Sequence, residues 1–193
     1  MKHANLDFNI GKVNPSGIGQ TAYRIRRRYI TGWPKVVDDP DQDDEIGEPD
    51  LVVLSGNFTL ATGKKWQKIY STQGKGSATF ESTGDTDSKM FINHATLSFP
   101  DLTPEALGFS KASVNDDFVY IVKSAGRYHV LGSEDYRTTT TPNGLSGDTP
   151  GSAKGVTFTI DSPDVSPLPV YEGTIETSEG TLNCKTGEFT PAA

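Results

Sequence analysis

An acidic run between residues 38 and 50 holds the side chains best suited to binding a cation. It contains eight carboxylates and no basic residue, and from Asp39 onward the carboxylates largely alternate along the chain, a spacing that suits a hard metal ion. A calcium-binding EF-hand loop also requires glycine at its sixth position and glutamate at its twelfth. Counting from Asp39 puts Asp44 and Asp50 at those positions. The run therefore favours a solvated acidic loop over a calcium site, and such a loop can meet a basic patch on another subunit.

Residues 61–65 look like the end of a phosphate-binding loop. Two lysines follow Gly63, but the glycine that the motif requires five positions earlier is Phe58, and no Ser or Thr follows Lys64. The glycines of residues 72–77 are typical of a turn between two strands. Neither segment predicts a nucleotide site.

Histidine and cysteine offer little for catalysis. His94 and His129 both lie in predicted strands, where a structural role is the ordinary case, and no Gly-x-Ser-x-Gly elbow is present to supply a nucleophile. Cys184 is the single cysteine, which excludes an intramolecular disulfide and a multi-cysteine metal site. It has no obvious partner base. We therefore expect no catalytic, cofactor or metal site, and we expect that the protein is not an enzyme.

Residues 23–29, Tyr-Arg-Ile-Arg-Arg-Arg-Tyr, mix basic and aromatic side chains. As a strand, the segment would place Arg24, Arg26 and Arg28 on one charged outer face. Some proteins that bind single-stranded nucleic acid share this composition, but a net charge of -7 argues against binding through phosphate neutralisation. Because the arginines lie just upstream of the acidic run, we expect the two to pair between subunits.

Trp33, followed by Pro34, lies at the start of the acidic region. A large aromatic side chain beside a rigid residue is suited to anchoring a subunit interface, and it is equally suited to folding back onto its own sheet. The sequence leaves both interpretations open. The candidate interface residues are Arg24, Arg26, Arg28, Trp33, Asp38, Asp39, Asp41, Asp43, Asp44 and Glu45.

The elements that would carry these residues are mostly strands. Residues 89–99 alternate between apolar and polar side chains except at Ile92 and Asn93, and residues 156–161 alternate without a break. Gly126 predicts a tight hairpin between residues 118–123 and 127–131. A shorter hairpin is expected at residues 181–190, and weaker strand patterns lie at residues 22–30, 50–54, 57–61, 65–71 and 77–81.

One helix is expected. Thr103 can cap it, Pro104 suits its first position, and Glu105 suits its first turn. The pattern predicts a mainly β fold, an antiparallel β-sandwich or partly closed barrel with one short flanking α-helix at about residues 103–112. Three segments are loop-like by composition, namely residues 31–49, 84–88 and 138–154, and the two long ones are where assembly contacts are expected.

Length and composition fit a single domain over residues 1–193, with an N-terminal arm at residues 1–20. Apolar residues make up 34% of the chain, so a modest core would gain from burying more surface against copies of itself. No segment is apolar enough for a signal peptide or a membrane span. We therefore expect a protein made in the cytoplasm that has no membrane partner.

Several segments between residues 50 and 175 follow one another in a fixed order. They are Gly-Asn-Phe-Thr-Leu-Ala at 56–61, Trp-Gln-Lys-Ile-Tyr at 66–70, Phe-Pro-Asp-Leu-Thr-Pro-Glu-Ala at 99–106, the hairpin with Leu-Gly-Ser at 131–133, Gly-Asp-Thr-Pro-Gly-Ser-Ala-Lys-Gly at 147–155, and Pro-Leu-Pro-Val-Tyr-Glu-Gly at 167–173. In this order and spacing the chain resembles the tail tube (major tail) proteins of phages and prophages that infect Bacteroides-like bacteria. These segments carry no catalytic signature.

The resemblance implies a β-sandwich that forms hexameric rings by strand pairing between subunits. The rings would stack into a hollow tube that conducts phage DNA, which makes the protein a structural part of the virion tail that contacts other tail proteins. The acidic net charge suits a duct that DNA passes without specific binding, because carboxylates facing the lumen would repel phosphates.

Two other functions stay open. A connector, tail terminator or decoration protein of a virion has the same β-rich, acidic and cysteine-poor profile, and the formation of long tubes would exclude it. A carbohydrate- or host-binding module would use exposed aromatic residues, and glycan binding by the monomer would favour it. The aromatic candidates are Trp33, Trp66, Tyr70 and Tyr136.

Overall fold

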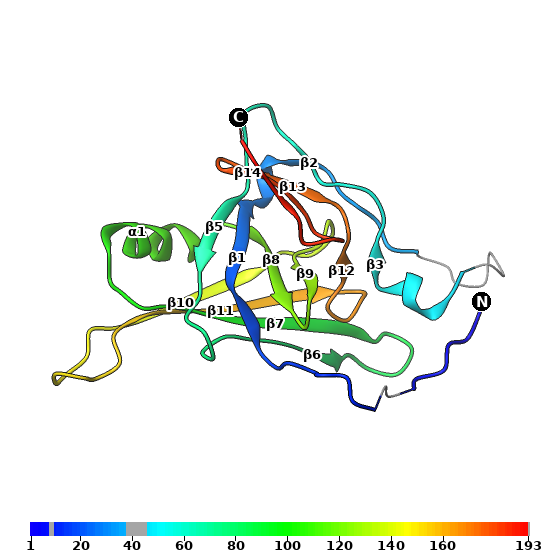
Figure 1. Ribbon diagram of the computed structural model, residues 1–193, viewed down its shortest axis with the longest axis horizontal. Helices are drawn as coiled ribbons and strands as arrows, with labels where there is room; N and C mark the ends of the chain where they lie inside the picture. Colours follow the sequence, from blue (N-terminus) through cyan, green and yellow to red (C-terminus); the bar gives the residue numbers. More distant parts are fainter. Residues whose placement is uncertain (8–9, 38–45, 193) are drawn as a thin grey trace.

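The computed structural model describes residues 1–7, 10–37 and 46–192, and its strands form layered sheets (Figure 1). The central sheet contains, in spatial order, β3 (Val53–Leu54), β12 (Val170–Tyr171), β9 (Arg127–Leu131), β8 (Phe118–Ser124), β1 (Ile18–Arg26) and β5 (Gln67–Tyr70). A four-stranded sheet contains β10 (Thr139–Leu145), β11 (Gly155–Asp164), β7 (Met90–Phe99) and β6 (Ser77–Thr83). Two smaller sheets contain β13 (Thr174–Thr177), β14 (Gly180–Asn183) and β15 (Phe189–Pro191), and β2 (Ile30–Gly32) with β4 (Thr59–Leu60).

The expected class is confirmed: the protein is mainly β, and its described residues form several sheets and one α-helix in a sandwich-like arrangement. Neighbouring strands run antiparallel except β12 and β3, which are parallel. In Figure 1 the four-stranded sheet lies below the central sheet and the C-terminal strands lie above it.

Strand β8 explains the layering, because both of its faces are buried. Phe118, Tyr120 and Val122 point into a core shared with the four-stranded sheet and the helix. Val119 and Ile121 point into a second core shared with the C-terminal sheet. An uninterrupted apolar run is typical of a strand covered on both sides. The two cores therefore meet at this strand.

The local turn and cap predictions are confirmed. β8 and β9 form the expected hairpin, with Ala125 and Gly126 at φ 48° and 84°, as a two-residue turn with two positive φ angles requires. Helix α1 (Pro104–Ser113) begins after Thr103, whose side-chain oxygen accepts a hydrogen bond from the Ala106 N–H at 3.2 Å. The C-terminal hairpin also forms, from β14 and β15.

Several boundaries differ from the sequence predictions. Residues 139–145 form the edge strand β10, so the loop predicted at 138–154 shrinks to residues 146–154. Threonine favours strands, and an edge strand tolerates Pro142. The strand predicted at residues 22–30 ends at Arg26, where a short 3₁₀ helix, η1 (Arg27–Tyr29), turns the chain into β2. Residues 31–49 likewise begin inside β2 and end inside η2 (Glu48–Leu51).

The break in alternation at Asn93 has a structural cause. Asn93 is fully buried in β7, where its side-chain N–H donates to the Ser166 carbonyl at 3.0 Å. Its side-chain oxygen accepts a hydrogen bond from the Leu168 N–H at 2.8 Å. A polar side chain therefore occupies a core position in order to fix the segment that follows β11.

Candidate functional site

The prediction that Arg24, Arg26 and Arg28 share the outer face of one strand is only partly confirmed. Arg24 and Arg26 do share a face of β1, but Arg28 belongs to η1. The face is not an open outer side at Arg24, because helix α1 covers it. The Arg24 guanidinium carbon lies 3.5 Å from the ring centre of Phe109, and Ala22 on the same face is buried in the first core.

Three of the neighbouring arginines have acidic partners within the same chain. Arg26 Nε lies 3.2 Å from an Asp116 carboxylate oxygen, and Arg28 Nη2 lies 3.5 Å from that same oxygen. Arg27 contacts Asp117 at 3.3 Å. These contacts connect the end of β1 to the turn between α1 and β8. The predicted pairing of Arg24, Arg26 and Arg28 with the acidic run of another subunit stays a prediction.

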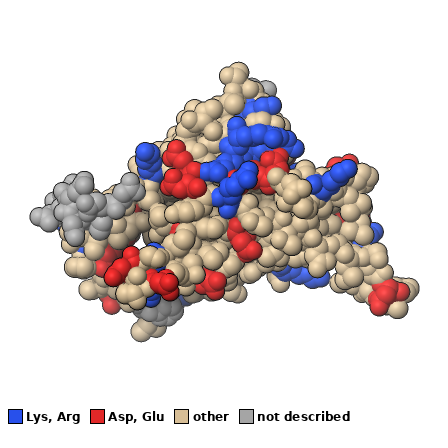
Figure 2. Space-filling view, turned by 180° about the vertical axis from the view of Figure 1, so that it is seen from behind, with Lys and Arg blue, Asp and Glu red and all other residues tan. Residues whose placement is uncertain are grey.

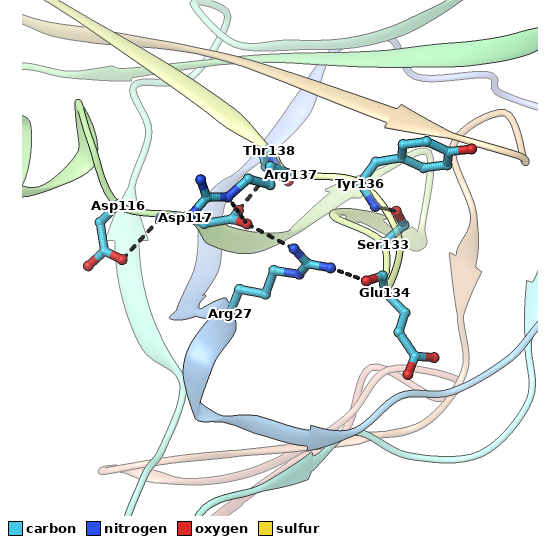
Figure 3. A network of polar contacts seen from close by, with 8 residues as sticks. All are labelled: Arg27, Asp116, Asp117, Ser133, Glu134, Tyr136, Arg137 and Thr138. Carbon is cyan, nitrogen blue, oxygen red and sulfur yellow. Dashed lines mark hydrogen bonds and ion pairs between the residues drawn. The ribbon is translucent and has the colours of Figure 1, made fainter.

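Asp117 is the centre of the contacts in Figure 3. One carboxylate oxygen accepts the Thr138 N–H at 3.1 Å, and the other lies 3.7 Å from Arg137 Nε and contacts Arg27. Arg27 also donates to the Glu134 carbonyl. The network ties the loop between β9 and β10 to the end of β1, which is a structural role. Asp116 and Asp117 are not among the residues predicted from the sequence, although the pair stands directly before an apolar strand.

Trp33 packs onto its own sheet. Its ring meets Phe58 edge to face at 5.5 Å between centroids, and Phe58 in turn contacts Trp66 and Tyr171 in the second core. Its partly exposed remainder lines a pocket of about 280 Å³ together with Asp164. The folded-back interpretation thus has direct contacts, and the interface role stays a prediction. The acidic candidates Asp38, Asp39, Asp41, Asp43, Asp44 and Glu45 lie outside the described residues.

Asp164 is a buried carboxylate in that pocket, with 6% of its surface exposed. Burial raises its pKa to about 6, and Asp135 adds to the increase. Backbone N–H groups of Ser166 and Val165 act in the opposite direction. With Trp33 and Phe58 as aromatic walls, the pocket joins an acidic group to an apolar surface.

The residues considered for catalysis do not come together. His94 Nδ1 lies 2.6 Å from Asp161 on the four-stranded sheet, whereas His129 contacts the Leu168 carbonyl on the central sheet. Burial lowers the pKa of His129 and raises the pKa of Cys184 to about 12. Across residues 1–7, 10–37 and 46–192, no group of three or more His, Cys, Asp or Glu side chains is arranged to hold a metal ion. Trp66 is 2% exposed, too buried to stack on a sugar.

The four-stranded sheet presents a broad polar face. Ala95, Leu97, Phe158 and Ile160 point into the first core, so the alternate side chains of these strands point away from it. One row of aligned residues across the sheet is Thr141, Thr159, Thr96 and Ser77, and the next is Thr139, Asp161, His94 and Thr79. No Lys or Arg occupies an outward position of β6, β7, β10 or β11.

Both borders of this sheet are open. Among the described strands, none pairs with the outer side of β6 or of β10. Beyond β10 and before β11, residues 146–154 project from the body of the molecule, and both views show this projection (Figures 1 and 2). Leu145, at the base of the projection, is 58% exposed.

The fold defines a class: a layered, mainly β domain in a sandwich-like arrangement. No helix in the described part of the chain is both long and apolar enough to cross a bilayer. Comparison with family models, with curated proteins and with solved structures finds no match.

Proposed function

We propose that the protein is a structural subunit that assembles with copies of itself into hexameric rings stacked as a hollow phage tail tube. The observation that carries this proposal is the four-stranded sheet, which has two open edges and an outward face free of Lys and Arg. The proposal places the protein in the virion tail, beside other tail proteins, with DNA passing through the lumen without specific binding.

The open edges supply a means of assembly. An edge strand carries unpaired N–H and C=O groups that can pair with another chain. β6 and β10 lie at opposite borders of one sheet, so β6 of one copy can pair with β10 of the next. Such a head-to-tail contact closes into a ring when the rotation between copies allows it.

The outward face supplies a surface that DNA would pass. Its aligned rows are mostly hydroxyl side chains, with acidic groups at Asp161 and Glu81. Proteins retain DNA mainly by neutralising phosphates with Lys and Arg, and these strands present neither outward. The face is therefore suited to lining a duct, because it has no Lys or Arg that would neutralise a phosphate.

The N-terminal arm gives further support. Leu6, Ile10 and Val13 are 98%, 95% and 83% exposed, so three apolar side chains before β1 contact little of the described chain. Fully burying one such side chain stabilises a complex by about 1.5–3 kcal/mol. Burial against another subunit would remove this surface from water.

Negative-stain electron microscopy with light scattering tests the proposal on the full chain over a range of concentrations. We expect rings or hollow tubes. In the edge variant Phe80→Asp, which places a charge at a 53% exposed position of β6, we expect assembly to be lost.

Phe189→Asp is the matched control, because Phe189 is 39% exposed on β15, in a layer remote from the four-stranded sheet. It should assemble normally. Circular dichroism should show that both variants fold. A wild-type chain that stays monomeric at every concentration would contradict the proposal.

A further inference from the structure

Arg24 differs from the arginines that follow it. Within the described residues it has no carboxylate partner, and its buried Nε has no hydrogen-bond acceptor. Its guanidinium instead lies on the Phe109 ring. Burial, with a smaller contribution from Arg26, lowers the pKa of Arg24 to about 10, and Tyr120 acts in the opposite direction. A half-buried cation without a counterion is destabilising, because burial removes water that would solvate the charge. A carboxylate from another chain would stabilise Arg24.

The surroundings of Arg24 form a basic groove of about 720 Å³ between β1, α1 and residues 63–67. Arg24, Arg26, Lys64 and Lys65 contribute cations, and Glu105 contributes one acid. Figure 2 shows Lys and Arg side chains gathered in one region of this side of the molecule. Within the part of the chain that the structure describes, neither lysine has an ion-pair partner. The groove therefore has a surplus of positive charge.

We propose that this groove binds a carboxylate of the acidic run, residues 38–50, of a second copy of the chain, with Arg24 as the residue that receives it. The inference rests on the self-assembly proposed above and names the surfaces that meet. A guanidinium that lies over an aromatic ring can still use its terminal N–H groups to bind a carboxylate through charge-assisted hydrogen bonds.

The acidic run is the occupant that the charges favour. It carries eight carboxylates and no basic residue in a chain whose net charge is -7. Nucleic acid is the competing anion, and the net charge of -7 works against binding it through phosphate neutralisation.

The occupant must come from another copy. Val37 and Ile46, which flank residues 38–45, line a different pocket together with Leu54 of β3. Figure 1 places β3 and α1 at opposite sides of the molecule. The groove and the residues that flank 38–45 therefore lie on different sides of one subunit, which favours a contact between subunits.

The test titrates a labelled synthetic peptide of residues 36–50 into the full chain and follows fluorescence anisotropy. Arg24→Met should weaken binding about tenfold or more, because a charge-assisted hydrogen bond is lost. Arg127→Met is the matched control, because Arg127 is exposed at the β8–β9 turn, and it should bind as the wild type does. A peptide with Asn and Gln in place of its acids should not bind.

Equal binding by Arg24→Met and Arg127→Met, or equal binding of the neutral peptide, would overturn the inference. So would tighter, Arg24-dependent binding of inorganic phosphate or a single-stranded oligonucleotide. The two proposals fail separately. Peptide binding does not require rings, so it would still support the groove if microscopy found no tubes. Normal tubes formed by Arg24→Met would overturn the role of Arg24 in the groove and leave the tube proposal intact.

Discussion

The guanidinium carbon of Arg24 lies 3.5 Å from the ring centre of Phe109, so that strand β1 meets helix α1 through a cation and an aromatic face. Three residues along the chain, Arg27 meets Asp117 at 3.3 Å in an ordinary ion pair. Arg27 thus has a carboxylate partner, whereas Arg24 has none among the described residues. The stability of variants at the two positions can measure this difference.

Methionine replacements should separate the two arginines. Arg27→Met leaves the nearly buried Asp117 with a weaker set of partners and should lower the free energy of unfolding by about 2 kcal/mol. Arg24→Met removes an unpaired cation and keeps an apolar contact with Phe109, so it should change stability by less than about 1 kcal/mol. Urea unfolding measures both. Equal destabilisation by the two variants would show that Arg24 has a counterion after all.

Asp164 should make stability depend on pH. Its pKa is raised to about 6 in the folded protein, so between about pH 4 and pH 6 the folded state binds more protons at this carboxyl than the unfolded state does. The stability that Asp164 contributes is therefore present at low pH and is lost as the pH rises, by about 3 kcal/mol at most. Asp164→Asn should remove this loss. Unfolding in urea from pH 4 to pH 7 checks it, and identical pH profiles for the two proteins would refute it.

Asn93 should be required for the position of the segment after β11. Asn93→Ala leaves the Ser166 carbonyl and the Leu168 N–H without their partner, and it should cost about 3 kcal/mol. Thr96→Ala is the control, because Thr96 faces outward on the same strand, and its effect should stay below about 0.5 kcal/mol. Chemical denaturation of both variants measures the difference. Equal effects would mean that the two buried hydrogen bonds contribute nothing.

The projection beyond β10 should matter for assembly and not for the monomer. Its hydrogen bonds are mostly internal, for example Ser152 to Asp148 at 2.6 Å, and one ion pair joins Lys154 to Asp101 at 2.7 Å. Replacing residues 147–153 by a two-residue Asn-Gly turn should therefore change stability by less than about 1 kcal/mol. Tubes should become shorter or fail to form. Calorimetry and electron microscopy provide the two measurements, and unaltered tubes would exclude the projection from the interface.

Features encoded within a few residues could be predicted from the sequence. The Thr103 cap, the turn at Gly126 and the alternation in residues 156–161 each depend on neighbours along the chain, and all three are found. The sequence predicts a loop where β10 forms, because this Thr-rich, Pro-containing segment becomes a strand only when β11 pairs with it. The buried position of Asn93 likewise depends on two groups more than seventy residues away.

The sequence by itself determined the mainly β class, the single short helix and the opposite charges of the arginine segment and the acidic run. The tertiary structure alone decided which arginines are already paired. Burial and ion pairing depend on the elements that close over a side chain, and those are supplied by α1 and by the turn before β8. The same holds for the polar sheet face. Only strand register aligns Thr141, Thr159, Thr96 and Ser77 from four separate strands and turns one face of the sheet away from the core.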